Sequence, residues 1–370
     1  MLSSKAKNFK KYLLLIVLGA AIFLLAGCVT IKTVPNGGGQ ATALPLGIFR
    51  SEDASTTWLS KSALLNAEGK ALTIGDVSVG QIILDPSDHL TLYIATDKGL
   101  YYSNDGAESW QQVPLFGTTA INNVAIDYFD KCNIYVTAGQ SIYKSSDCLR
   151  TWQEIYFDKR AGLQITNVST ERYNKNNVYA ANSFGDILKS LDAGKTWQII
   201  KRINNPIRQI LIDKDDTRII YFATESNGLF KTLDGGKTWS DDKAQTDLNK
   251  GLDPFFESKT FHYLVQDMTQ KNSLLLASKF GLLKSSDGGM TWESIELITP
   301  ERGANIYSLA VDPKDDKIIF YGTDSTIYKS FDGGKNWATQ KSPTSGAANI
   351  LLIDPQNSKI IYLGAKVIKK

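Results

Sequence analysis

The sequence predicts an all-β fold: a single seven-bladed β-propeller whose ring is closed by strands from both ends of the chain. Three observations predict this fold. A short motif that ends in tryptophan occurs seven times, and successive copies are 42 to 53 residues apart. The chain then ends on strand-like segments that no further copy follows. A repeat of about 40–50 residues is typical of a four-stranded propeller blade.

The motif contains all seven tryptophans of the chain. An aspartate stands five residues before each tryptophan, and a serine or threonine stands seven residues before it. We number the copies box 1 to box 7. Their aspartates and tryptophans are, in chain order, Asp53 and Trp58, Asp105 and Trp110, Asp147 and Trp152, Asp192 and Trp197, Asp234 and Trp239, Asp287 and Trp292, and Asp332 and Trp337.

The boxes resemble the Asp box, or BNR repeat, which reads Ser/Thr-x-Asp-x-Gly-x-Thr-Trp. Box 6 matches it fully in Lys284–Trp292, whereas Ala54 and Cys148 take a glycine position in boxes 1 and 3. In such a turn the aspartate accepts backbone N–H groups, and glycine supplies positive φ angles. The tryptophan is expected to pack in the apolar layer beside its blade. The resemblance therefore implies a structural role for each aspartate.

Each box belongs to a longer unit with the pattern of four strands. In Ile306–Gln340 we expect strands at 307–311, 318–322 and 326–330, with a fourth from Asn336. Box 1, in 47–59, has no two strands before it, and 350–354 and 359–364 have no box behind them. The two ends should therefore complete one blade, which removes an open sheet edge. The same order of strands begins in the other units at Gln81, Asn122, Thr166, Arg208, His262 and Asn349.

The N-terminus predicts export. Lysines precede an apolar run at 12–26, and Leu25-Ala26-Gly27-Cys28 resembles the lipobox of bacterial lipoproteins. The resemblance implies that Cys28 is acylated and that residues 1–27 are a signal peptide, followed by a tether at 28–46 and the propeller at 47–370. Alternatively, residues 12–31 are uncharged and long enough to span a membrane as an uncleaved anchor. Both alternatives place the propeller outside the cytoplasm, membrane-anchored at a bacterial cell envelope.

The charge balance argues against nucleic acid as a partner. Of 41 basic residues, four lysines precede Cys28, while none of the 38 acidic residues does. The part that follows is therefore nearly neutral and lacks the basic surface that phosphate binding needs. His89 and His262 are isolated and cysteines are few, so the sequence indicates neither a metal site nor a cofactor.

Function is expected in the loops opposite the boxes. Two of these are long, 60–77 and 240–260, and the second contains Phe255 and Phe256, which either contact a partner or pack on their own blade. A glycoside hydrolase would need two suitably spaced carboxylates. The candidates in these loops are Asp97, Asp186, Glu225, Asp253 and Asp324.

Several families share the box pattern. Sialidases carry it on six-bladed propellers, with an arginine triad and an N-terminal Phe-Arg-Ile-Pro motif that is absent here. Xyloglucanases use two seven-bladed propellers, and sortilin-type receptors have larger rings. The architecture is most similar to that of photosystem II assembly factors, which are single, non-catalytic propellers and often lipoproteins. Their loop motifs are not evident here, so their partner does not carry over. We expect a monomeric, non-enzymatic binding or assembly module for a protein or glycan; the alternative is a carbohydrate-active hydrolase.

The two remaining cysteines are expected to form a disulfide. When Asp127 is aligned with Asp312, Cys132 falls just before the second strand of its blade and Cys148 falls in the box after the third strand. These two strands form a hairpin, so both thiols should lie at one end of it, within disulfide reach. An oxidising envelope would favour the bond. The alternative is two free, half-buried thiols.

Overall fold

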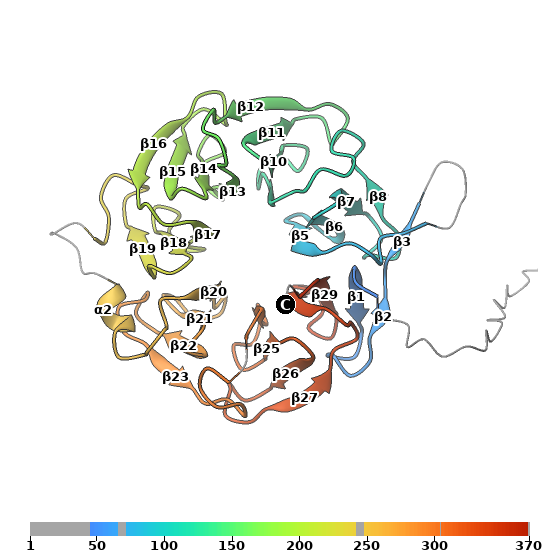
Figure 1. Cartoon of the computed structure of the whole chain (residues 1–370), viewed down its shortest axis with the longest axis vertical. Coiled ribbons are helices and arrows are strands. Elements are labelled where there is room, and N and C mark those ends of the chain that lie inside the picture. The colour runs from blue at the N-terminus through green and yellow to red at the C-terminus, as the bar shows by residue number, and fades with distance from the viewer. Residues whose placement is uncertain (1–44, 66–71, 242–247, 304, 369–370) are drawn as a thin grey trace, which may run out of the picture. The chain divides into compact units, whose positions relative to one another are not determined.

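The computed structural model describes residues 45–65, 72–241, 248–303 and 305–368. Within these ranges the chain forms seven small antiparallel sheets arranged as blades around a central axis (Figure 1). This confirms the predicted seven-bladed, all-β propeller. Cys28, the signal or anchor segment and nearly all of the tether lie outside the described residues. Within the described ranges, no helix is long and apolar enough to cross a membrane.

Blade 1 joins the two ends of the propeller, as predicted. Its strands, from the axis outward, are β28 (Ala347–Ile353), β29 (Ile361–Lys366), β1 (Ile48–Ser51) and β2 (Leu59–Ser60). In the antiparallel pairing of β1 with β29, Ile48 lies opposite Gly364 and Ser51 lies opposite Ile361. The sheet of this blade therefore depends on strands from opposite ends of the chain.

Blades 2 to 7 follow in chain order, each with its first strand innermost. Blade 2 contains β5 (Val79–Asp85), β6 (Asp88–Thr96), β7 (Gly99–Ser103) and β8 (Gln111–Gln112). Blade 3 contains β9 (Asn123–Ile126), β10 (Ile134–Ala138), β11 (Ser141–Ser145) and β12 (Gln153–Phe157). Blade 4 contains β13 (Ile165–Thr170), β14 (Val178–Asn182), β15 (Asp186–Ser190) and β16 (Gln198–Arg202).

Blade 5 differs, because its sheet has three strands among the described residues: β17 (Ile207–Ile212), β18 (Ile220–Thr224) and β19 (Leu229–Thr232). Blade 6 contains β20 (Phe261–Gln266), β21 (Leu274–Ser278), β22 (Leu282–Ser285) and β23 (Glu293–Ile295). Blade 7 contains β24 (Ser308–Val311), β25 (Ile319–Gly322), β26 (Thr326–Ser330) and β27 (Ala338–Lys341). A small hairpin, β3 (Ala63–Leu64) with β4 (Leu72–Thr73), and a short helix, α2 (Asn249–Leu252), lie in the two long loops.

Burial follows the position of a strand within its blade. The second strands are almost wholly buried, as in β14 and β21, whereas the outermost strands β12 and β16 are largely exposed. A strand covered on both faces by neighbouring blades reads as a continuous apolar run, and this explains sequences such as Leu274–Ser278. The apolar core is therefore divided into layers between adjacent blades.

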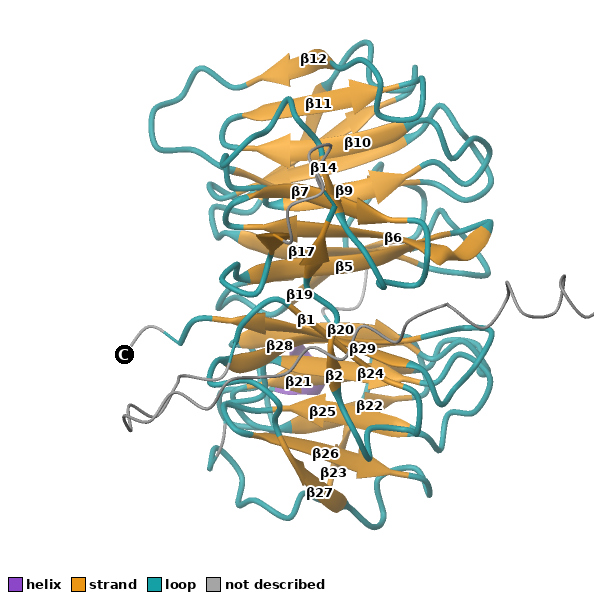
Figure 2. Ribbon diagram, turned by 90° about the vertical axis from the view of Figure 1, so that its right-hand side faces the viewer, coloured by secondary structure: helices purple, strands orange, loops and turns teal. Residues whose placement is uncertain are grey.

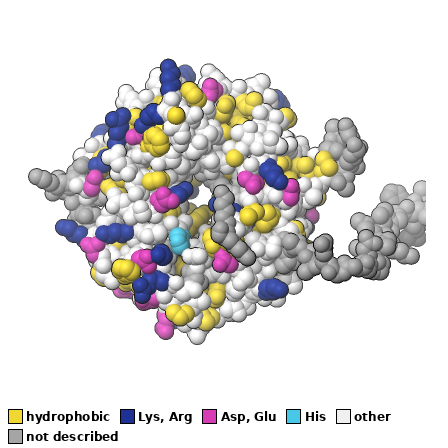
Figure 3. All heavy atoms as spheres, viewed as in Figure 1, with side chains coloured by type: hydrophobic (Ala, Val, Ile, Leu, Met, Phe, Trp, Pro, Cys, Tyr) yellow, Lys and Arg dark blue, Asp and Glu magenta, His cyan; other side chains and the backbone are white. Residues whose placement is uncertain are grey.

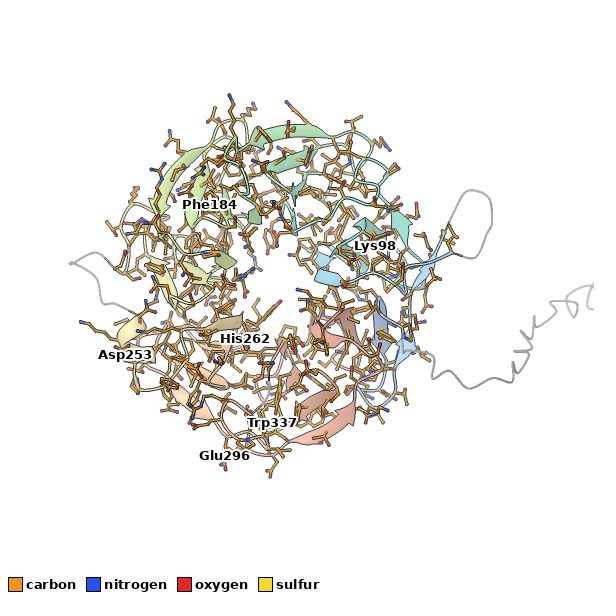
Figure 4. The ribbon with its side chains drawn as sticks, viewed as in Figure 1. Lys98, Phe184, Asp253, His262, Glu296 and Trp337 are labelled. Atoms are coloured by element: carbon orange, nitrogen blue, oxygen red, sulfur yellow. A yellow bond between two sulfur atoms is a disulfide. The ribbon has the colours of Figure 1, made fainter. Side chains whose placement is uncertain are left out.

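The ring has two faces, visible edge-on in Figure 2. Turns between the first and second strands open on one face together with the boxes; we call it the box face. Turns between the second and third strands and the connections between blades open on the other, the loop face. Figures 1, 3 and 4 look onto the loop face, where the described C-terminal strand β29 ends.

Candidate functional site

The boxes form one repeated hydrogen-bonded turn. In box 1, the Asp53 carboxylate accepts the backbone N–H of Thr57 at 2.8 Å and its hydroxyl at 2.7 Å. The Ser51 hydroxyl donates to Asp53 and accepts the N–H of Ser55. The same frame recurs in box 6 around Asp287. These groups hold the turn together, which is the structural role that the resemblance implied.

These hydrogen bonds lower the carboxylate pKa values. The backbone and side chain of Thr57 lower the pKa of Asp53 to about 2. The side chain and backbone of Thr196 do the same for Asp192, and those of Asn336 for Asp332. A carboxylate that accepts several donors is stabilised in its charged form. These box aspartates therefore stay ionised at neutral pH and accept the hydrogen bonds of their turns.

Two consecutive residues after each box aspartate have positive φ angles, including those that are not glycine. This conformation costs an L-residue about 1–2 kcal/mol, whereas glycine adopts it freely. The turn is therefore imposed by the frame even where the sequence does not favour it. The non-glycine residues are Ala54, Ser55, Ala107, Cys148, Leu149 and Ala193.

A cation from one blade caps the next box at five of the seven junctions. The third strand of blade 4 carries Lys189, whose Nζ donates to the carbonyl of Gly235 in box 5 at 2.7 Å. The hydroxyl of Tyr179 donates to the same carbonyl at 3.3 Å. Burial lowers the pKa of Lys189 and raises that of Tyr179. The equivalent cations are Lys144, Lys231, Lys329 and Arg50, which bond to Ala193, Gly288, Ala54 and Gly106.

The two long loops cover box tryptophans. The hairpin β3–β4 lies against box 2, where Trp110 is fully buried and its Nε1 donates to the carbonyl of Lys61 at 2.7 Å. The second loop places Leu248 and Leu252 in the cluster that buries Trp292. Boxes 1, 3, 4 and 7 have half-buried tryptophans. Part of each loop expected to bind a partner therefore stabilises its own blade.

A large cavity among the described residues is the central channel. It has a volume of about 1050 Å³ and is lined mainly by the innermost strands. Amide and hydroxyl side chains dominate its polar lining, including those of Gln81, Asn122, Thr166, Gln209 and Asn349. Figure 3 shows the opening on the loop face, and Figure 4 places His262 on β20 beside it.

Many of these polar side chains form hydrogen bonds between adjacent blades. Gln209, for example, donates to the carbonyl of Leu264 at 2.8 Å and accepts its N–H at 3.0 Å. The innermost strands of neighbouring blades are not paired in one sheet, so such bonds bridge them. Equivalent bonds join Gln81 to Val124, Asn122 to Ile165, Thr166 to Ile207, Ser308 to Ala348 and Asn349 to Val79. His262 bonds to the backbone of Ile306 at the junction between blades 6 and 7.

The mouth of the channel on the loop face carries charge. Arg208 and Glu225 form an ion pair there, with each side chain about half exposed. Asp97 accepts the N–H of Ser78 at 2.8 Å. Burial lowers the pKa of His262, which favours its neutral form, and its Nδ1 has no hydrogen-bond partner. The mouth therefore presents a positive charge, negative charges and hydrogen-bonding groups at the opening of the channel.

The structure separates the five candidate carboxylates. Asp97 and Glu225 line the channel, whereas Asp186, Asp253 and Asp324 do not. Asp186 is buried and held by Arg160 at 2.5 Å, with Arg202 at 3.3 Å. Asp253 pairs with Lys259. Asp324 hydrogen-bonds to Tyr307 and thereby contributes, after burial, to the raised pKa of that tyrosine.

A model of the DUF6242 β-propeller domain matches residues 130–363. The chain belongs to this family. No curated protein matches it.

Solved structures show similar folds at low sequence identity. The GH74 enzyme of Niastella koreensis has a TM-score of 0.62 and 18% identity over 78% of this chain, and the GH74 xyloglucanase of Xanthomonas campestris has 0.61 and 16%. This DUF6242 chain spans about half the length of both, because the match covers 51% of each. YCF48 bound to D1 peptide has a TM-score of 0.58 and 14% identity, over 80% of this chain and 94% of YCF48. These likenesses show the shared fold.

The Phe pair of this DUF6242 propeller has two different environments. Phe255 is half buried and packs edge-on against Phe280, with ring centroids 5.2 Å apart. Phe256 is 68% exposed, and the guanidinium of Arg302 lies 5.2 Å from its ring centroid. Phe255 therefore packs within the fold, whereas Phe256 is exposed, and contact of Phe256 with a partner stays a prediction.

Cys132 and Cys148 are joined as a disulfide in the structure, with Cα atoms 4.0 Å apart. The bond links the first turn of blade 3 to box 3, on the box face. No group of three or more His, Cys, Asp or Glu side chains suited to a metal ion occurs among the described residues.

Sequence reasoning missed the residues that connect blades. The amides and lysines that connect blades contact residues about 40–57 positions away, or 270 and 275 positions away where the partner lies near the other end of the chain. A signal was nevertheless present in the sequence. Each capping lysine stands one residue before the Ser or Thr of the box in its own blade, although it bonds to the box of the next blade. Reading the repeat beyond the box would have drawn attention to Lys144, Lys189, Lys231, Lys284 and Lys329.

Proposed function

We propose that this DUF6242 propeller is a non-catalytic binding or assembly module that takes a protein or glycan on its loop face. The observation that carries the proposal is the channel mouth: the ion pair of Arg208 and Glu225 and the carboxylate of Asp97 stand at the opening of a channel of about 1050 Å³, on a ring whose blades are hydrogen-bonded to one another. A rigid scaffold that presents a concave polar surface is a common form of binding site. The YCF48 structure, which holds a D1 peptide on a similar fold, supports a peptide as one class of ligand.

The charged groups at the mouth also favour binding over hydrolysis. Glycoside hydrolysis needs one carboxylate as acid and another as base or nucleophile, spaced across the scissile bond. Glu225 is already paired with Arg208, and Asp97 caps the backbone of Ser78. Each of these carboxylates is thus already held by a donor of the propeller itself. The ion pair can instead open to receive a partner's charged group.

Binding is tested with the full-length chain in detergent. The wild type is used to capture partners from an envelope extract, and the paired variants Arg208→Ala and Arg218→Ala are compared. Arg208 lies at the mouth, whereas Arg218 lies in a turn on the box face, paired with Asp216. We expect the first variant to lose captured partner at least fivefold and the second to retain it. Equal retention by both variants would contradict binding at the mouth.

A hydrolase is the second candidate function, since Asp97 and Glu225 line the same cavity and GH74 enzymes have a similar fold. It is tested by assaying aryl glycosides and polysaccharides with wild type, Asp97→Asn and Glu225→Gln. We expect no turnover above a protein-free blank. Turnover that either substitution abolishes would establish the hydrolase and overturn the binding proposal.

We also propose that the propeller is held at a bacterial envelope through acylated Cys28. The support is the sequence Leu25-Ala26-Gly27-Cys28 after an apolar run. Metabolic labelling with palmitate should mark the wild type and not Cys28→Ser, and the variant should keep its leader. Equal labelling of both would favour the uncleaved membrane anchor instead.

A further inference from the structure

Exposed aromatic side chains gather on the box face, opposite the proposed binding mouth. The first turns of blades 3 and 4 carry Tyr128, Phe129 and Tyr173, which are 44%, 54% and 62% exposed. Proline takes the position of Tyr128 in three other blades, as Pro86, Pro313 and Pro355. A single exposed aromatic residue is unremarkable, but three in adjacent turns form a surface that calls for an explanation.

These rings are held in place. The guanidinium of Arg172 lies 5.0 Å from the ring centroid of Tyr128, which connects the turns of blades 3 and 4. Buried Asp127 accepts the N–H of Phe129 at 2.7 Å and that of Asp130 at 3.2 Å. The hydroxyl of Tyr173 donates to the carbonyl of Lys214 in blade 5 at 3.3 Å. Fixed rings lose little conformational entropy when a ligand binds.

A hollow lies beside two of the rings, Tyr128 and Phe129. Its volume is about 300 Å³, and it is lined by residues 85–87 of blade 2 and 127–131 of blade 3. Pro86 and Tyr128 also line the central channel, so the hollow lies next to the channel's end on the box face. This volume is at the lower limit for a small-molecule site, about 300–1000 Å³. It suits a compact ligand unit better than a folded protein surface.

Charged side chains lie directly beside the aromatic rings. Asp130 and Lys131 directly follow Phe129 in the sequence. The buried carboxylates of Asp85 and Asp127 also line the hollow, one from each of the two turns. The core of a protein interface is depleted of charged residues, so this composition does not favour a protein partner. A sugar ring presents C–H groups on its faces, which stack on aromatic rings, and hydroxyls at its rim, which bond to charged side chains.

We propose that the box face of blades 2 to 4 carries a second binding site, which takes a neutral saccharide through Tyr128, Phe129 and Tyr173. The rings stack on sugar faces, and Asp130 and Lys131 bond to hydroxyls. This site is separate from the loop face. Its existence does not depend on what the channel mouth binds.

The test is affinity electrophoresis of the full-length chain in detergent, through gels that contain hydroxyethyl cellulose, xylan, galactomannan or pullulan. Tyr128→Ala/Phe129→Ala and Tyr173→Ala are compared with Phe331→Ala, a matched control. Phe331 is 53% exposed on the same face, but it belongs to box 7. Thermal unfolding of each variant verifies that it folds.

We expect at least one polysaccharide to retard the wild type, with an affinity that falls at least tenfold in the double variant and changes less than twofold in Phe331→Ala. The same tenfold fall should appear when Tyr128→Ala/Phe129→Ala is combined with Arg208→Ala, which separates this site from the channel mouth. The proposal is overturned if none of the four polysaccharides retards the wild type. It is also overturned if the Tyr128→Ala/Phe129→Ala and Tyr173→Ala variants behave like Phe331→Ala, either alone or combined with Arg208→Ala.

Discussion

Box 3 and box 5 form the same turn from different residues. Asp147 accepts the N–H of Thr151 at 2.9 Å, and Asp234 accepts that of Thr238 at the same distance. The next two residues have positive φ angles in both boxes. Box 5 uses two glycines there, whereas box 3 uses Cys148 and Leu149. The hydrogen-bonded frame therefore determines the conformation, and glycine only makes it less costly.

The two boxes also differ in what supports them from outside. Lys189 and Tyr179 of blade 4 cap the carbonyl of Gly235 in box 5. Tyr102 stands at the corresponding lysine position before box 3, and its hydroxyl bonds to Gln111 of its own blade. Box 3 has the disulfide instead. Two strained residues cost about 2–4 kcal/mol, and a disulfide across such a loop contributes about 3 kcal/mol, so the bond offsets the strain.

The largest difference is expected between the two tryptophans. Trp239 is buried and its ring lies 5.4 Å from that of Phe222, whereas Trp152 is half buried against Phe116. Trp239→Ala should lower the free energy of unfolding by about 3–5 kcal/mol, and Trp152→Ala by clearly less, because it leaves a smaller cavity. Urea denaturation followed by circular dichroism measures both. A larger loss for Trp152→Ala would contradict this account of burial.

Loss of the disulfide is expected to have the next largest effect. Cys132→Ser should destabilise the protein by about 3 kcal/mol, because the unfolded chain regains the freedom of the closed loop. Reduction of the wild type should produce the same loss, and Cys132→Ser should not respond to reductant. Mass spectrometry of non-reduced, envelope-purified protein should find the two peptides linked. Free thiols in that material would refute the bond.

The capping lysine of box 5 should contribute less. Lys189→Met keeps the stem of the side chain but removes the donor to Gly235, while Tyr179 remains bonded there. We expect a loss of about 1–2 kcal/mol, typical of a partly buried hydrogen bond from a charged group. Lys195→Met, in the exposed part of box 4, serves as the control and should change stability by less than about 0.5 kcal/mol. An equal loss of stability in both variants would contradict a stabilising role for the hydrogen bond between Lys189 and Gly235.

The smallest effect concerns pH. Burial acts to raise the pKa of Asp234, but hydrogen bonds from Thr238 and Thr232 outweigh it and lower the pKa to about 2. Because the folded pKa lies below the unfolded value of about 3.9, this contribution is present above pH 4 and is lost as the pH falls toward 2. Asp234→Asn should therefore be less stable than wild type at pH 7, with a gap that narrows on acidification. Thermal midpoints at pH 7, 5 and 3 measure it; a constant gap would contradict the linkage.

The sequence predicted the fold because its determinants repeat locally. Asp-to-Trp spacing identified the blades, and the missing strands around box 1 identified the closure. The strand limits differ by up to three residues, as for β28, which was expected at 350–354. The predicted disulfide pairing followed from the same alignment. All of these features depend on residues within one blade or on the ends of the chain.

What connects blades could not be predicted in the same way. Whether a box tryptophan is buried depends on a neighbouring loop, as the cover over Trp110 shows. The environment of Phe256 depends on Arg302, from a different connection. Buried Asp186 is held by Arg160, which lies on the connection from the preceding blade. Such contacts require the three-dimensional register of the ring.

Blade 1 also has a consequence for biosynthesis. Strand β1 is among the first parts of the propeller to be synthesised, and its partner β29 is among the last. Roughly 300 residues separate them, which at about 5–20 residues per second is a delay of about 15–60 s. During that time β1 has an unpaired edge and the ring cannot close. The chain therefore cannot complete its ring before β29 has been synthesised, and a chain truncated before β29 would never bury that edge.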